Sequence, residues 1–362
     1  MSVVIVNLSH HPRKMVLLLI GAILFTNTCT ACNRNHLENS PSSDMKRSVI
    51  GFSLATLKED RWLRDRDIFV AKAKQAGFDV ILSNSNNNSK MQYEQVEDMI
   101  RKNVDILVIA PQDRDDAARC VQDAKKAGIP VVSYDRLIRN ADVDVYVSFD
   151  TEKIGKIQAK ILLDAAPQGG YLIVNGSKDD NNTTLTHRSC MAQLQPSIAS
   201  GRVRIVAETW VKDWRREGAY EFVHDQLKLH PAEITGIIAG NDSLAWGVID
   251  ALSEAKLARK VLVAGMDADL AACQRIVDGT QLMTVYKPIE KFAEQVVDVC
   301  KTLSRGEKIS SIKTINDGTY NVPYIVVDVI GVTKENIDET VIKDGFQLKE
   351  DVYRTDTPSS EP

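Results

Sequence analysis

The sequence predicts an α/β protein made of two doubly wound parallel-sheet lobes joined by a three-segment hinge. The first observation is that short runs of Val, Ile and Leu alternate with helical patterns along the chain, as in parallel βαβ units. The second is that this rhythm restarts near residue 150, which gives two series of four or five units. The third is the length, because 362 residues can form two lobes with separate cores.

The first series opens with an apolar strand at residues 48–54 and a helix with 3.6-residue periodicity at 61–75. This helix ends before Ala76 and Gly77, where glycine suits a helix C-cap. The nearly uninterrupted apolar strands predict a sheet that is covered on both faces. The other elements of this series are expected as strands at 79–82, 105–109, 130–134 and 143–148 and as helices at 93–102 and 115–126.

The second series opens with a helix at residues 151–165 and a strand at 171–174. Asn241 and Asp242 provide N-cap residue types before a later helix, and Pro288 occupies a first-turn position, where proline is favoured. The remaining elements are expected as helices at 185–198, 217–228, 244–255, 270–277 and 289–304 and as strands at 203–209, 234–239, 261–264 and 281–285.

The two series define two lobes that share the C-terminal part of the chain. We predict an N-terminal lobe of residues 48–149 plus 287–316 and a C-terminal lobe of residues 150–286 plus 317–350. The chain would then cross between the lobes near Ser148-Phe149, near 285–287 and near 315–318, and these crossings are the hinge candidates. A cleft between two such lobes is a usual ligand site, and the lobes of such proteins close around the ligand.

Residues 1–32 have the pattern of a signal peptide. Arg13 and Lys14 precede an apolar stretch at 16–25, which is shorter than the roughly 20 residues that span a bilayer. The small residues before Cys32 resemble a bacterial lipobox, in which this cysteine is lipidated and anchors the protein to the membrane. The segment could instead be a plain signal peptide or an uncleaved anchor.

Two polar segments flank the predicted lobes. Residues 33–47 are rich in Asn and Ser, and we expect them to form a flexible tether between the anchor and the lobes. Residues 351–362 are expected to form a disordered tail.

The composition argues against several classes of protein. The net charge of −4 offers no basic domain of the kind that binds nucleic acid. The chain lacks a nucleophile elbow, an H-E-x-x-H zinc motif and a phosphate-binding glycine loop, so we expect no enzyme, no cofactor and no metal site. Widely spaced cysteines predict single buried thiols, although a disulfide outside the cytoplasm remains open; they are Cys120, Cys190, Cys273 and Cys300.

Polar residues follow many of the predicted strands. Because open parallel sheets bind ligands outside the carboxyl ends of their strands, these positions are candidate ligand contacts. They are Asp135, Arg136, Asn181, Asn241, Asp242, Asp267 and Lys287. Two tryptophans, Trp62 and Trp214, stand in strongly charged stretches. Asp, Asn, Arg and Lys with two indoles suit a sugar, whose hydroxyls need donors and acceptors and whose ring faces stack on aromatic rings.

Some of these positions have a second interpretation that involves no ligand. Asn and Asp are both preferred N-caps, so Asn241 is expected to face the cleft while Asp242 caps the helix. Asp267 is ambiguous in the same way, because Asp269 could cap the next helix. An exposed turn would explain Asp135 and Arg136, a surface position would explain Lys287, and core packing would explain Trp62 and Trp214.

Several strings are long enough to be specific to one family. They are Asp60-Arg61-Trp62, Tyr134-Asp135-Arg136, Asp180-Asn181-Asn182, Asn241-Asp242, Asp267-Ala268-Asp269-Leu270, Met283-Thr284-Val285-Tyr286-Lys287-Pro288-Ile289 and Thr340-Val341-Ile342-Lys343-Asp344-Gly345-Phe346. From about residue 49 to 346 the chain resembles the bacterial periplasmic sugar-binding proteins of the ribose, galactose and xylose type, most closely the xylose branch. It departs from that branch at 54–57, where acidic residues are usual, and at Met266, where Gln is usual.

The resemblance implies that a monosaccharide, with D-xylose first, binds between the lobes and is delivered to an ABC permease outside the cytoplasm. It implies hydrogen bonds to the sugar from Arg61, Asp135, Arg136, Asp180, Asn181, Asn241, Asp267 and Lys287, with Trp62 and Trp214 on the faces of its ring. A second possibility is a membrane-tethered sensor that presents its closed form to a histidine kinase ectodomain or a chemoreceptor. A transcriptional repressor of this fold would need a helix-turn-helix before the first strand, where this chain has the signal segment.

Overall fold

The computed structural model describes residues 47–310 and 313–354. The predicted signal peptide, Cys32 and nearly all of the predicted tether lie outside the described residues. Within the described part of the chain, none of the helices combines the length and the apolar character of a bilayer-spanning segment. The prediction that a disordered tail begins at residue 351 is wrong, because helix α10 (Lys349–Tyr353) includes residues 351–353 and buries Val352.

A seven-stranded sheet in the order β11-β12-β5-β4-β3-β1-β2 forms the N-terminal lobe. Its strand pairs are parallel except for β11–β12, which confirms the predicted βαβ arrangement. The strands are β1 (Val49–Leu54), β2 (Asp79–Asn84), β3 (Ile106–Ile109), β4 (Val131–Tyr134), β5 (Val145–Phe149), β11 (Thr314–Asn316) and β12 (Asn321–Val327).

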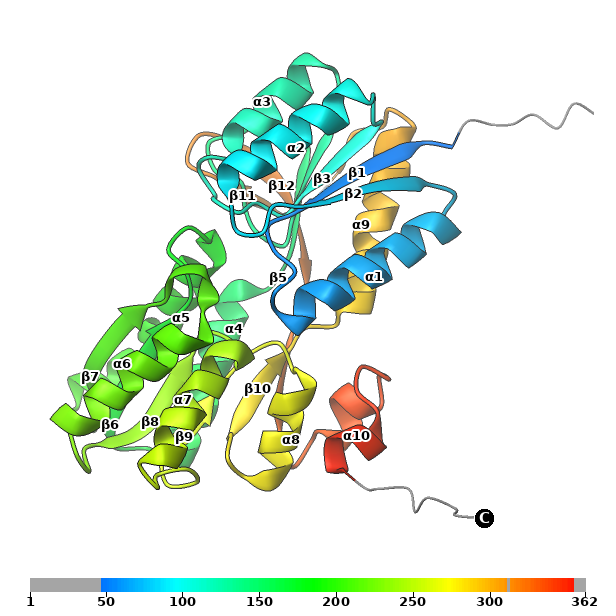
Figure 1. Ribbon diagram of the computed structural model, residues 1–362. Helices are drawn as coiled ribbons and strands as arrows, with labels where there is room; N and C mark the ends of the chain where they lie inside the picture. The colour runs from blue at the N-terminus through cyan, green and yellow to red at the C-terminus, as the bar shows by residue number, and fades with distance from the viewer. Residues whose placement is uncertain (1–46, 311–312, 355–362) are drawn as a thin grey trace, which may run out of the picture. The chain divides into compact units, whose positions relative to one another are not determined.

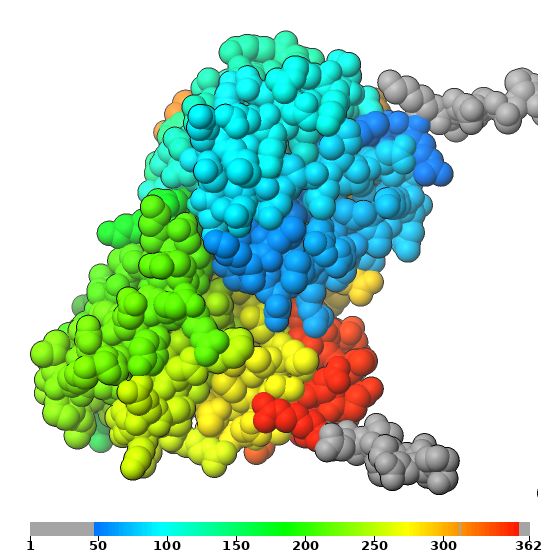
Figure 2. All heavy atoms as spheres, in the orientation of Figure 1, coloured from blue at the N-terminus to red at the C-terminus, as the bar shows by residue number. Residues whose placement is uncertain are grey.

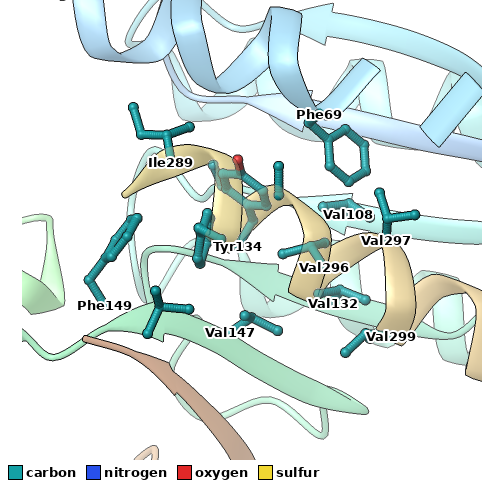
Figure 3. Packing of buried hydrophobic residues seen from close by; sticks show 14 of the residues in the cluster. Phe69, Val108, Val132, Tyr134, Val147, Phe149, Ile289, Val296, Val297 and Val299 are labelled. Carbon is teal, nitrogen blue, oxygen red and sulfur yellow. The ribbon is translucent and has the colours of Figure 1, made fainter. Parts of the chain in front are cut away.

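Helices cover both faces of this sheet (Figure 1). On one face α1 (Asp60–Gln75) and α9 (Ile289–Ser304) share a hydrophobic cluster with the strands, and on the other face α2 (Ser89–Arg101) and α3 (Ala118–Lys126) form a second cluster. Figure 3 shows the ring of Tyr134 beside α9 in the first cluster. This packing fixes the end of β4 at the point where Asp135 and Arg136 follow.

A six-stranded sheet in the order β13-β10-β9-β8-β6-β7 forms the C-terminal lobe, and only its edge strand β13 is antiparallel. Helices α4 and α5 cover one face, and α6 and α7 cover the other. Its strands are β6 (Gly169–Asn175), β7 (Val203–Trp210), β8 (Ile234–Ala239), β9 (Leu262–Ala264), β10 (Met283–Tyr286) and β13 (Ile330–Thr333). Its helices are α4 (Thr151–Ala165), α5 (Asn181–Ala199), α6 (Arg216–Leu229), α7 (Asp242–Glu254) and α8 (Leu270–Asp278).

The C-terminal segment packs onto this lobe. Helix α10, drawn in red, lies against α8, drawn in yellow (Figures 1 and 2), and Val352 shares a small cluster with Cys273 and Ile276. Cys273 and the three other cysteines of the described residues, Cys120, Cys190 and Cys300, are buried and free. The prediction of single buried thiols is therefore confirmed.

Within residues 47–310 and 313–354, the chain passes between the two sheets three times. The first two passages, from β5 to α4 and from β10 to α9, lie close to their predicted positions. The third, predicted near 315–318, is wrong, because β12 pairs in parallel with β5 and so belongs to the N-terminal sheet. Residues 317–320 form the turn of the β11–β12 hairpin instead, and Gly318 has φ +115° there, a backbone conformation that glycine adopts most readily. The chain passes between the sheets after Val327, before β13.

Candidate functional site

One cavity lies where strands of both sheets end. Nine of the ten predicted ligand-binding residues line it: Arg61, Trp62, Asp135, Arg136, Asp180, Trp214, Asn241, Asp267 and Lys287. Apart from the partly exposed Trp214, each of them exposes 6% or less of its surface. The centre of a water-sized sphere can move through about 50 Å³ of this space, which is several times the ~10–15 Å³ that one water molecule needs. The cavity is therefore small, and its lining combines buried charged side chains with apolar ones such as Phe149 and Ile173.

Arg61 and Asp135 form a buried ion pair on the N-terminal side of the cavity. The Arg61 Nη2 lies 2.8 Å from Asp135 Oδ1, and Nη1 donates to Oδ2 at 3.1 Å. Behind it, Arg61 Nε donates to Asp65 at 2.9 Å, and Tyr134 Oη donates to the same carboxylate at 2.6 Å. Burial acts to raise the pKa of Asp135, but Arg61 and Lys287 outweigh it and the pKa is lowered. Asp135 is thus an ionised acceptor at neutral pH.

Arg136 joins the two lobes across the cavity. Its Nε lies 2.8 Å from Oδ2 of Asp180, the residue that precedes α5. Burial raises the pKa of Asp180, and the nearby guanidinium of Arg136 opposes that rise. Removing one partner of a charged pair this deeply buried strongly destabilises the folded protein, because the other charge stays buried without compensation. The bond therefore ties the position of one lobe to that of the other.

Asp267 and Lys287 form the third charged pair, on the C-terminal side. Lys287 Nζ lies 2.6 Å from Asp267 Oδ1. Asp267 has φ +108° and Ala268 has φ +57°, a left-handed region that residues other than glycine seldom adopt. Such strained backbone clusters at ligand sites, where the surrounding structure holds it in place. The interpretation of Lys287 as a surface lysine is wrong, since it is 3% exposed.

The two predicted tryptophans line the cavity from different lobes. Trp62 is also part of the core cluster of the N-terminal lobe, and the guanidinium carbons of Arg61 and Arg136 lie 4.3 and 5.1 Å from the centre of its ring. Trp214 packs closely on Gly176, where an added Cβ would lie 2.3 Å from the indole. Core packing and a ligand-facing position are thus combined in Trp62.

Some polar atoms of the cavity are buried without a hydrogen-bond partner, and Trp214 Nε1 and Glu59 Oε2 are among them. Glu59 was not among the predicted residues, and burial raises the pKa of its carboxyl group. Buried donors and acceptors are nearly always paired in proteins, because leaving one unpaired costs about 1–3 kcal/mol. A hydroxylated ligand can donate a hydrogen bond to Glu59 Oε2 and accept one from Trp214 Nε1. The charged run before Trp62 is the only sequence signal for Glu59.

Asn181 is the one predicted residue that does not line the cavity; it lines a separate groove beside the β11–β12 hairpin. Its neighbour Asn182 lines the cavity instead and donates from Nδ2 to the carbonyl of Asp135 at 2.8 Å. The physical reason is that α5 begins at Asn181, with Asp180 as its N-cap, and successive helical residues are turned by about 100°. We predicted that this helix begins at 185, which placed both asparagines in a loop.

The capping assignments around Asn241 are also corrected. Asn241, not Asp242, caps α7, because its Oδ1 accepts from the Leu244 N–H at 2.9 Å. Asn241 nevertheless lines the cavity, and its amide N–H₂ is not used by the cap. Asp269 is the N-cap residue of α8 but makes no side-chain cap bond. Among the described residues, no cluster of His, Cys, Asp and Glu could hold a metal ion.

Comparison with known proteins agrees with this architecture. The family model of the periplasmic binding protein domain matches residues 50–308. The chain is 45% identical over 314 residues to the D-xylose-binding periplasmic protein of Haemophilus influenzae, which covers 87% of this chain and 95% of that protein. It is 41% identical over 323 residues to the corresponding protein of Escherichia coli, over 89% of this chain and 98% of that one.

Solved structures show the same fold. The carbohydrate transporter solute-binding protein of Chloroflexus aurantiacus, in complex with D-glucose, has a TM-score of 0.79 and 31% identity over 83% of this chain and 97% of that one. A solute-binding protein of an ABC transporter from Clostridium phytofermentans, with bound β-D-glucose, has a TM-score of 0.78 and 26% identity over 84% of this chain and all of that one.

Proposed function

Because this chain belongs to the periplasmic binding protein family, we propose that it binds D-xylose or a closely related monosaccharide outside the cytoplasm and delivers it to an ABC permease. The observation that carries the proposal is the cavity itself: three ion pairs, two indoles and unpaired polar atoms such as Trp214 Nε1 surround a small enclosed space. The choice of D-xylose rests on two relatives that are named as D-xylose-binding periplasmic proteins. Lipidation at Cys32 remains a prediction on residues outside the described ones.

The charge balance of the cavity favours a neutral ligand. Each of its three cations already faces a carboxylate: Arg61 with Asp135, Arg136 with Asp180 and Lys287 with Asp267. A phosphate or carboxylate ligand would face these acids without a spare cation among the described lining residues. A sugar hydroxyl, by contrast, can donate to a carboxylate and accept from a guanidinium or ammonium group in the same place.

Binding is coupled to closure in this proposal. Contacts between the lobes, such as Arg136 with Asp180 and Asn182 with the Asp135 carbonyl, belong to the closed arrangement. The ligand favours closure only by its greater affinity for the closed form. A micromolar dissociation constant requires about 8 kcal/mol, and a pentose of about ten heavy atoms can supply that within the limit of about 1.5 kcal/mol per atom.

The first experiment is a calorimetric titration of the purified protein with D-xylose, L-arabinose, D-ribose and D-glucose. We expect D-xylose to bind with a micromolar or lower dissociation constant and the other sugars to bind more weakly, because each places a hydroxyl or hydroxymethyl group differently against the fixed charged pairs. Absence of heat with all four sugars would contradict the proposal, and the family would then indicate the fold alone.

Replacing Glu59 by glutamine is expected to weaken D-xylose binding by about tenfold while stabilising the ligand-free protein. The amide is a weaker acceptor for a hydroxyl than the carboxylate, but it removes the cost of a buried charge. Calorimetry and thermal unfolding measure the two effects. The matched control is Glu94→Gln, an exposed residue on α2, which should change neither.

The stability effect of Glu59 has a defined pH dependence. Because its pKa is raised in the folded state, the folded chain holds this proton to higher pH than the unfolded chain does. Its contribution to stability is therefore lost as pH rises through the folded pKa, and Glu59→Gln should remove that loss. An equal gain of the variant over wild type at pH 4 and pH 8 would contradict the burial of this charge.

A further inference from the structure

A buried carboxylate lies just outside the cavity, at Asp242. It is 1% exposed, and no lysine or arginine of the described residues forms an ion pair with it. Instead three donors converge on it: Gln281 Nε2 at 2.8 Å, Thr284 Oγ1 at 2.8 Å and the backbone N–H of Asp269 at 3.1 Å. Asp242 does not line the cavity, so contact with the ligand does not explain it.

These bonds hold the loop that carries Asp267. The Asp242 N–H donates to the Met266 carbonyl at 2.8 Å, and its carboxylate accepts from the Asp269 N–H, so both ends of the loop are attached to it. In the middle, the Ala268 N–H donates to Thr284 Oγ1, whose hydroxyl in turn donates to Asp242. The loop between these attachments contains the two left-handed residues, which need an external restraint to persist.

The carboxylate of Asp242 lies so close to the backbone of residue 265 that this residue must be glycine. A Cβ added to Gly265 would lie 2.1 Å from Asp242 Oδ1, so a side chain at this position would displace the carboxylate from the loop. Burial, followed by the nearby carboxylate of Asp267, raises the pKa of Asp242 to about 7, while Arg275 opposes the rise. The fold thus keeps an acid where its charged form is disfavoured, although an apolar residue would carry no such cost.

We propose that Asp242 is a positioning residue of the sugar site: it clamps loop 266–269 in its left-handed conformation, so that Asp267 and its partner Lys287 face the ligand. When it is ionised, the Asp242 carboxylate accepts from all three donors at once, because it has no donor of its own. Asparagine has the same shape but would turn an N–H₂ group toward one of those donors. This inference rests on the proposed function for its ligand, but the loop conformation can be measured without any sugar.

The test is Asp242→Asn, with two readouts. In the ligand-free protein, hydrogen exchange at the backbone amides of Ala268 and Asp269 should become at least tenfold faster, because the acceptor network is broken. D-xylose binding should weaken by about tenfold in calorimetry. Asp250→Asn, on the same helix but in a partly exposed pair with Arg216, is the matched control and should leave both values unchanged.

A double-mutant cycle separates positioning from a general loss of stability. If Asp242 acts through Asp267, Asp242→Asn should reduce the D-xylose affinity of an Asp267→Asn variant by less than it reduces the affinity of the wild type. In an Arg136→Lys variant the reduction should be as large as in the wild type. A loss of equal size in both backgrounds would overturn the proposal. If Asp242→Asn does not fold, Thr284→Val, which removes the relay hydroxyl, replaces it, and Thr284→Ser should restore wild-type exchange and binding.

The outcomes keep the two proposals apart. Wild-type hydrogen exchange in Asp242→Asn would refute the clamp whether or not the protein binds a sugar. Wild-type D-xylose affinity in a variant whose loop exchanges faster would also refute it, since the loop would then not set the affinity. A wild-type protein that binds none of the four sugars refutes the proposed function, while the exchange measurement still decides whether Asp242 holds the loop.

Discussion

Replacing Arg136 by alanine is expected to weaken D-xylose binding by at least a hundredfold. The substitution removes a fork of donors from the cavity, and it leaves the carboxylate of Asp180 buried without its partner at 2.8 Å. It also removes the charged bridge between the lobes, so closure itself becomes less favourable. Removing one partner of a buried charge pair costs about 3–5 kcal/mol, because the other charge stays buried and uncompensated. Calorimetric titration measures the loss directly.

Three controls define the meaning of that result. Arg101→Ala removes an exposed arginine of α2 and should bind D-xylose as the wild type does. Arg136→Lys keeps the charge but not the planar fork, so its affinity should lie between those of wild type and Arg136→Ala. Thermal unfolding of each variant shows whether the fold is retained. Near wild-type binding by a folded Arg136→Ala would remove Arg136 from the site.

Replacing Trp214 by alanine is expected to weaken D-xylose binding by about a hundredfold. The indole offers an apolar face to the sugar ring and a buried Nε1 that has no partner among the described residues. Tryptophans in such positions commonly account for about 2 kcal/mol or more of binding free energy. Trp214→Phe keeps an aromatic face but loses the N–H, so it should retain part of the affinity. Calorimetry and the ligand-induced change in tryptophan fluorescence measure both.

A glycine and another tryptophan provide the controls for Trp214. Gly176→Ala would place a Cβ 2.3 Å from the indole, so it should displace the ring and weaken binding without changing the tryptophan itself. Trp246→Ala removes a tryptophan that is 43% exposed on α7 and stacks on Arg216, and it should bind normally. An equal loss in Trp246→Ala and Trp214→Ala would mean that the effect is not local to the cavity.

The order of elements and most of the site could be predicted because both follow from local patterns. Alternation of apolar strands with amphipathic helices leaves few arrangements other than parallel sheets. The carboxyl ends of parallel strands meet at one edge of each sheet, so the polar residue after β4 lies at that edge of the N-terminal sheet and those after β8, β9 and β10 lie at that edge of the C-terminal sheet. This is why Asp135, Asn241, Asp267 and Lys287 come together as predicted.

Where the predictions were wrong, the deciding contacts were distant in sequence or depended on a single helical position. The third passage between lobes was misplaced because strand β12 is identified by its pairing with β5, which no local pattern reveals. Asn181 was preferred to Asn182 because the start of α5 was unknown, and one residue along a helix turns a side chain by about 100°. Glu59 was missed because only the fold shows that its carboxyl group is partly buried, while Lys58 and Asp60 on either side are exposed.

The sequence by itself determined the two-lobed α/β fold, the edge of each sheet where a ligand would bind, and the sugar-like chemistry of that edge. These depend on periodicity and on residue types at strand ends, which are local properties. Only the tertiary structure decided which carboxylate pairs with which cation, that Glu59 and Trp214 keep unpaired polar atoms, and that Asp242 holds the loop of Asp267. Those are relations between segments far apart in the chain, and packing of the two lobes creates them.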